Sequence, residues 1–157
     1  NAIGVLLPNE ADRERANQET KERWGKEINY LEQSPIRPDA LLVVSELSKN
    51  YRLGIIANQP SEVKAKLDQG GLLQFFSHAG ISTDYDLHKP DPQIFKIVLQ
   101  ETEAVPARSA MIDDNIERGL LPARQLGMKT VWFKLGDREA NNIDWTISSL
   151  SDLLTIF

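Results

Sequence analysis

Short apolar runs alternate with amphipathic segments along most of this 157-residue chain. Apolar runs of strand length occur at 2–7, 53–57, 110–112 and 130–133, with weaker ones at 78–81 and 145–147. Between them, the spacing of apolar residues predicts helices over 39–50, 61–69, 91–102, 117–126 and 151–157. Strands that alternate with helices are typical of an α/β domain with a doubly wound parallel sheet, a Rossmann-like three-layer sandwich.

Local signals place the predicted helix boundaries. Ser61 and Asp91 are predicted N-caps, because short polar side chains accept hydrogen bonds from the amides of a first helical turn. Gly127 is predicted to stop the helix that precedes it. Pro122 is predicted to kink that helix or to shift its start. Residues 82–87 have no regular period and are predicted to form an irregular loop.

Residues 9–34 are strongly polar and carry only a thin apolar stripe. They are predicted to form one or two exposed helices, a minimal helical cap on a single domain that spans 1–157. The chain begins with Asn1 rather than Met, so further residues upstream remain an open alternative. An exposed first strand at 2–7 would favour self-association into a homo-oligomer.

Composition narrows the function classes. Apolar residues make up 41% and charged residues 26% of the chain, as in ordinary globular proteins. The net charge of −5, with acids interleaved among the basic residues, argues against a nucleic-acid partner. The absence of cysteine excludes disulfides and thiolate sites. No apolar run reaches the roughly 20 residues of a membrane span, and no secretory signal precedes the first strand, so a cytoplasmic protein is predicted.

Polar side chains lie where the predicted strands end. Asn58 follows one apolar run, and Asp113 and Asp114 follow another. In doubly wound sheets, ligands bind beyond the carboxyl ends of the strands. We therefore expect these side chains to come together, with Lys89 reaching over them from the turn before the next helix.

These residue types suit phosphoryl transfer, which needs positive charge against the phosphate oxygens and, usually, Mg²⁺ held by carboxylates. Lys89 can supply the charge, Asp114 with Asp113 the carboxylates, and Asn58 a hydrogen bond to a phosphate oxygen. Each also has a structural interpretation. Lys89 alone could be a solvated loop lysine, the acids could cap the following helix, and Asn58 could brace its own turn.

As an ordered set, these motifs resemble the haloacid dehalogenase-like (HAD) superfamily, most of whose members are Mg²⁺-dependent phosphohydrolases. The resemblance runs from about residue 36 to the C-terminus and rests on residues 53–58, 88–95, 111–119, 123–130 and 147–153. It implies a HAD-like fold and a small phosphorylated substrate. It further implies that Lys89 and Asn58 bind phosphate, that Lys89 and Asp114 are catalytic, and that Asp114 and Asp113 bind Mg²⁺.

Two departures from the family pattern lie in the matched motifs. Ala57 stands where the family has Ser or Thr, which removes one phosphate-oxygen donor. Gly119 stands where the acidic motif carries its second acid, if Asp114 is the metal aspartate.

The family's Asp-x-Asp nucleophile motif is not found in this chain. One alignment of the first apolar run places Asn1 and Ile3 at the two aspartates, and another places Pro8 and Glu10 there. In a third interpretation, the nucleophile strand lies upstream of Asn1. Two functions therefore follow: a Mg²⁺-dependent phosphatase acting on a small phosphate ester, or a catalytically inactive HAD-like module that binds or regulates.

Overall fold

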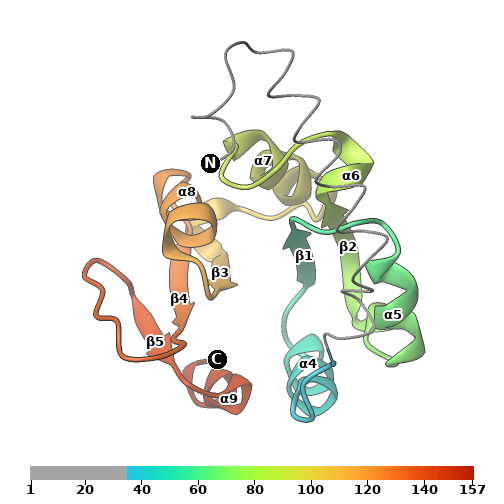
Figure 1. The fold of residues 1–157 in the computed structure, drawn as a ribbon, viewed down its shortest axis with the longest axis horizontal. Helices are drawn as coiled ribbons and strands as arrows, with labels where there is room; N and C mark the ends of the chain where they lie inside the picture. Colours follow the sequence, from blue (N-terminus) through green and yellow to red (C-terminus); the bar gives the residue numbers. More distant parts are fainter. Residues whose placement is uncertain (1–34) are drawn as a thin grey trace, which may run out of the picture. The chain divides into compact units, whose positions relative to one another are not determined.

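The computed structural model describes residues 35–157, of which Ile36–Phe157 form one compact unit (Figure 1). The predicted strand at 2–7 and the predicted cap at 9–34 lie outside the described residues. The strands of the unit are β1 (Leu53–Ala57), β2 (Phe76–Ile81), β3 (Ala110–Asp113), β4 (Lys129–Phe133) and β5 (Trp145–Ile147). Its α-helices are α4 (Ala40–Ser48), α5 (Val63–Gln69), α6 (Ser82–Tyr85), α7 (Pro92–Glu101), α8 (Leu121–Gln125) and α9 (Leu153–Ile156).

All strand pairs among the described residues are parallel, as predicted. They form two sheets, with strand orders β1-β2 and β3-β4-β5. In the first, Ile55 lies opposite Ala79; in the second, Ile112 lies opposite Val131. Figure 1 shows the two sheets facing each other through the edges of β1 and β3, which are not hydrogen-bonded to one another. The α/β architecture of alternating strands and helices is therefore confirmed, in two parallel sheets within the described part.

Strand β4 shows how the helices cover both faces of its sheet. Successive strand side chains point to opposite faces. Val131 and Phe133 join a buried cluster with α4 and α9, whereas Trp132 joins a different cluster with α7 and α8. The first cluster comprises Val43, Val131, Phe133, Ile147 and Leu153. The second comprises Ile94, Phe95, Met111, Ile116, Leu120, Ala123, Met128 and Trp132. A two-residue period in the sequence thus produces two helix-covered cores.

Two local predictions around α5 and α6 are wrong. Helix α5 begins at Val63, and the Ser61 hydroxyl donates instead to Asp84 Oδ1 at 2.6 Å. Residues 82–85, predicted as irregular loop, form the short helix α6, which ends at Asp86 in the left-handed conformation, with φ of 52°. The Ser61 hydroxyl therefore hydrogen-bonds a carboxylate far away in the sequence and does not cap its own helix. Local sequence spacing cannot indicate such a contact.

The predicted helix at 117–126 is divided by Pro122. A π-helical turn over Ile116–Leu120 precedes α8, and Pro122 lies in the first turn of α8, where its missing N–H costs no hydrogen bond. The proline therefore shifts the helix start, one of the two predicted outcomes. Gly127, with φ of 89°, follows the helix end as predicted.

The N-cap of α7 is confirmed and gives a first testable prediction. Asp91 accepts a hydrogen bond from the Gln93 amide at 2.8 Å. Asp91→Ala should lower the free energy of unfolding by about 1 kcal/mol, measured by urea titration. Asp68→Ala is the matched control, because the Asp68 carboxylate is exposed and has no partner among residues 35–157. An equal loss in both variants would contradict the assigned cap.

No helix in the described part of the chain is long and apolar enough to cross a membrane.

Candidate functional site

The predicted site residues meet at the carboxyl ends of β1 and β3. Asn58 directly follows β1, and Asp113 is the last residue of β3. Lys89 lies between α6 and α7, in a turn that also contains a cis peptide bond to Pro90. The parallel direction of both sheets brings the two strand ends to one edge, as the sequence predicts.

Asn58 holds the backbone of Lys89 through both ends of its side-chain amide. Lys89 N donates to Asn58 Oδ1 at 2.7 Å, and Asn58 Nδ2 donates to the Lys89 carbonyl at 2.8 Å. This reciprocal pair fixes the lysine loop against the end of β1. Asn58 thus has a structural role, because it braces the lysine loop. One hydrogen of its Nδ2 group remains for a further acceptor.

The Lys89 amine reaches across to Asp113. Its Nζ lies 2.5 Å from Asp113 Oδ2, and the two side chains are only 12% and 7% exposed. Asp113 Oδ1 accepts from the Asn115 amide at 2.7 Å. Because both carboxylate oxygens are satisfied, the buried charge of Asp113 is compensated. Lys89 is therefore not a solvated loop lysine.

Gly119 is required by the position of the Asp113 carboxylate. A Cβ atom at Gly119 would overlap the Asp113 side-chain atoms, far inside the 3.0 Å that real Cβ atoms keep. The π-helical turn brings its backbone this close to the end of β3. The glycine that replaces the expected second acid is thus the residue that leaves room for Asp113.

Asp114 stands beside this pair with a different environment. Its residue surface is exposed, yet partial burial of the carboxyl group raises its pKa, and the neighbouring Asp113 raises it further through a hydrogen bond and charge repulsion. The indole Nε1 of Trp132 donates to the Asp114 carbonyl at 3.2 Å, which holds the backbone in place. With Lys89 and both acids ionised, the site carries one net negative charge.

The raised pKa predicts that neutralising Asp114 stabilises the fold at neutral pH. A carboxyl whose folded pKa lies above its ordinary value of 3.8 favours folding at low pH, and that contribution disappears as the pH rises through the raised pKa. Asp114→Asn should therefore raise the free energy of unfolding at pH 7–8 by less than about 1 kcal/mol, because the residue is exposed. The melting temperature should rise slightly with it. Thermal melts should show the gain shrinking as the pH falls through the raised pKa and disappearing near the ordinary value of 3.8. A loss of stability at pH 8 would contradict it.

The donor set fits a hard divalent cation coordinated in part by water. Mg²⁺ commonly takes one or two protein carboxylates and fills its other positions with water and substrate oxygens. Asp113 and Asp114 supply two adjacent carboxylates, and the repulsion that raises the Asp114 pKa is what a bound cation would relieve. Among the described residues, no group of three or more acidic, histidine or cysteine side chains could hold a metal. A Mg²⁺ ion here would thus depend on water and substrate for most of its ligands.

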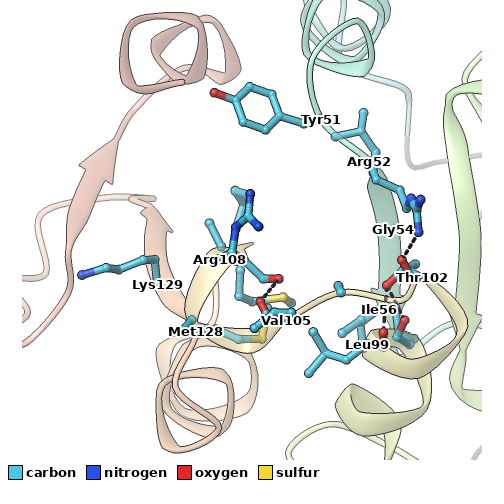
Figure 2. Close-up of a pocket in the computed structure, with 18 of the residues that line it drawn as sticks. Tyr51, Arg52, Gly54, Ile56, Leu99, Thr102, Val105, Arg108, Met128 and Lys129 are labelled. Carbon is cyan, nitrogen blue, oxygen red and sulfur yellow. Dashed lines mark hydrogen bonds between the residues drawn. The ribbon is translucent and has the colours of Figure 1, made fainter.

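A cavity of about 600 Å³ lies between the facing edges of β1 and β3. Figure 2 shows Gly54 and Ile56 on the β1 side and Met128 and Lys129 on the opposite side. Residues of β3 complete the wall next to Met128. None of the four predicted site residues lines this cavity, which meets the strands mainly toward their amino-terminal ends.

Comparison with known proteins agrees with this geometry. The sequence model of the haloacid dehalogenase-like hydrolases matches residues 6–133. The chain belongs to this family. The match includes all four predicted site residues and the strands that present them.

Individual HAD proteins are similar over much of the chain. The glyceraldehyde 3-phosphate phosphatase of Pyrococcus furiosus is 32% identical over 136 residues, which cover 82% of this chain and 56% of that protein. A HAD phosphatase of Thermococcus onnurineus has a similar structure, with a TM-score of 0.75 and 29% identity, over 81% of this chain and 60% of that one. A HAD hydrolase of Bacillus subtilis, crystallised with bound magnesium, shares the fold at 22% identity and a TM-score of 0.71, over 76% of this chain and 55% of that one. This chain spans about half the length of the curated relatives it matches.

Sequence reasoning missed two residues that shape this site. The backbone N–H of Asn115 donates to Asp113 Oδ1, and the Asn115 side-chain Oδ1 accepts from the backbone N–H of Arg118 at 2.8 Å. In the sequence, Gly119 marks only the loss of the family's second acid. A polar residue after a strand end is a usable signal for the first. The second depends on a π-helical turn that no local pattern in the sequence marks.

Proposed function

We propose that this protein is a Mg²⁺-dependent phosphatase that acts on a small phosphate ester. The observation that carries the proposal is the buried ion pair between Lys89 Nζ and Asp113, presented at the strand ends beside a second, exposed carboxylate. A cation and two acids at one sheet edge are the groups that offset phosphate charge and hold Mg²⁺ in phosphoryl transfer.

Each residue has a distinct role in the proposal. Lys89 places its amine, already oriented by Asp113, against the phosphate oxygens and offsets their charge. Asp114 and Asp113 hold Mg²⁺, which would supply Lewis-acid stabilisation of the phosphate. Asn58 fixes the Lys89 backbone and has one amide hydrogen left for phosphate. Support for a small phosphorylated substrate comes from the Pyrococcus furiosus relative, a glyceraldehyde 3-phosphate phosphatase.

The nucleophile in this proposal comes from a strand outside residues 35–157. The edges of β1 and β3 have no strand partner among the described residues, and the mainly apolar cavity between them separates two parallel sheets. A parallel strand there would pair both edges and end beside Lys89.

Hydrogen exchange along β1 and β3 tests for that strand. In a parallel strand, alternate residues direct their N–H and C=O groups to opposite neighbours. With the strand in place, every amide of β1 and β3 should exchange slowly. Alternation of slow and fast amides along both strands would show that the edges are open.

Two sequence features favour a second candidate, a binding module without turnover. Ala57 lacks the hydroxyl that the family uses, and Gly119 leaves no acid at the second position of the acidic motif. A site with fewer phosphate and metal ligands would bind more weakly and stabilise a transition state less.

Hydrolysis of a generic aryl phosphate separates the two candidates. If the nucleophile lies within the 157 residues, this chain should release phosphate in the presence of Mg²⁺, and EDTA should abolish the release. Asp114→Asn should lose the activity, whereas Asp68→Asn, at an exposed position in α5, should keep it. No release by a chain that is folded by circular dichroism would show that these 157 residues lack turnover on their own. The same assay with an Asp-x-Asp strand added upstream of Asn1 would then decide: restored release supports the phosphatase, and continued absence of release contradicts it and favours the binding module.

A further inference from the structure

Four side chains next to the candidate site form a hydrogen-bonded group that the proposed function does not use. We call this group, Ser61, Lys64, Thr83 and Asp84, the Asp84 cluster. Asp84 Oδ1 accepts from the Ser61 hydroxyl at 2.6 Å, and Asp84 Oδ2 lies 2.6 Å from Lys64 Nζ. The Ser61 and Thr83 hydroxyl oxygens lie 2.9 Å apart. Both oxygens of the carboxylate are therefore engaged by one segment, which follows β1.

The cluster joins the two segments that lead to the predicted phosphate ligands. One segment follows β1 and begins with Asn58; the other includes α6, which precedes Lys89 in the chain. Direct contacts reinforce the connection, since the Gln59 carbonyl accepts from the Ser82 hydroxyl at 3.2 Å and the Thr83 hydroxyl at 3.3 Å. These contacts hold the two segments together one residue after Asn58 and six residues before Lys89, the two residues that hydrogen-bond each other.

Charge strengthens the contacts of Asp84. Its hydrogen bond with Lys64, followed by its hydrogen bond with Ser61, lowers the Asp84 pKa below the ordinary range, so the ionised form is favoured. The Lys64 and Asp84 side chains are 39% and 25% exposed, so the ion pair alone is weak. A carboxylate that also accepts a hydroxyl hydrogen bond has a defined orientation, and orientation is what a loop anchor needs.

We propose that Asp84 is a positioning residue, which holds the segments after β1 and β2 in register so that the Asn58 amide meets the Lys89 backbone. Asp84 acts by holding α6 to Ser61 and Lys64 of the segment after β1, and it does not contact the phosphate. This positioning role rests on the proposed function only in so far as Asn58 and Lys89 bind the phosphate of a substrate. The geometry that it explains, the paired hydrogen bonds of Asn58 and Lys89, is independent of turnover.

Hydrogen exchange at the Lys89 amide, followed by NMR in the 157-residue chain, tests the positioning role without substrate. This amide donates to Asn58 Oδ1, so its protection reports the contact directly. Asp84→Ala should make it exchange about tenfold faster, while the amides of β4 keep their rates. Lys64→Met, which removes only the ion pair, should have a smaller effect in the same direction. Asp68→Ala, an equivalent change in α5 at a carboxylate without a described partner, should have none.

An unchanged Lys89 amide in Asp84→Ala would overturn the proposal. Equal acceleration at Lys89 and throughout β4 would also overturn it, because that result describes general destabilisation. If Asp84→Ala does not fold, Lys64→Met and Ser61→Ala test the proposal instead. In these variants too, the exchange rate of the Lys89 amide is compared with the rates of the β4 amides. Because exchange needs no catalysis, a chain without phosphatase activity can still show the positioning effect. In an active enzyme, Asp84→Ala should additionally lower kcat/KM about tenfold.

Discussion

Replacing Lys89 by methionine should destabilise the protein by about 3–5 kcal/mol, the usual result when one partner of a buried ion pair is removed. Methionine keeps most of the side-chain volume but leaves the Asp113 carboxylate, which is 7% exposed, without its cation. The free energy of unfolding from urea titration measures the loss. Lys96→Met in α7 is the matched control, since Lys96 is exposed and has no described partner, and it should cost less than about 0.5 kcal/mol.

A double-mutant cycle identifies the cause of that loss. If the penalty comes from an uncompensated charge on Asp113, then Asp113→Asn in the Lys89→Met background should restore part of the stability. Additive losses in the double variant would show that Lys89 and Asp113 do not interact energetically, which would contradict the assigned ion pair.

Gly119→Ala should have the second large effect, a loss of about 1–3 kcal/mol together with displacement of the Asp113 carboxylate. The added methyl group would occupy the space of that carboxylate, and both the helical turn and the end of β3 are fixed by backbone hydrogen bonds. Urea titration measures the stability, and a crystal structure or the NMR signals of the Lys89 side chain would report the altered ion pair.

Gly54→Ala is the matched control for this substitution. A Cβ atom at Gly54 would meet Thr102 and Val98 side-chain atoms at 3.4 Å, an ordinary contact. We expect a change below about 1 kcal/mol there, because alanine also restricts the unfolded chain. Equal effects at the two glycines would mean that the Asp113 carboxylate can move without cost.

The apolar runs predicted the strands well because burial dominates in a sheet covered by helices. Leu53–Ala57 and Trp145–Ile147 have the predicted bounds, and Asp91 caps α7 as predicted. Strand β2 begins at Phe76, two residues earlier than predicted, since Ser77 and His78 interrupt its apolar pattern. These elements depend on period and on nearest neighbours, which are visible in the sequence.

The side-chain contacts of the site were only partly predictable. Strand ends indicated that Asn58, Lys89 and Asp113 would meet, and they do. The sequence did not indicate that Asn58 would bond the Lys89 backbone, or that Asp113 rather than Asp114 would hold the lysine. Adjacent residues at a strand end point in opposite directions, so a shift of one position exchanges their surroundings.

The predictions that failed involve contacts between distant segments. Ser61 was expected to cap its own helix, but its hydroxyl bonds Asp84, 23 positions away. Residues 82–85 lack an apolar period, yet they form α6, where Thr83 bonds the segment after β1. Such contacts depend on how the two strand ends approach each other, and they have no local sequence signal.

Isothermal titration calorimetry of Mg²⁺ and inorganic phosphate tests most directly whether Lys89, Asp113 and Asp114 form a phosphate and metal site. Binding does not depend on a nucleophile, so the titration examines the site itself. We predict that the 157-residue chain binds Mg²⁺, that Asp114→Asn weakens Mg²⁺ at least about tenfold, and that Lys89→Met weakens phosphate by a similar factor. Binding that is absent from the folded chain, or equal in all three proteins, would contradict the site.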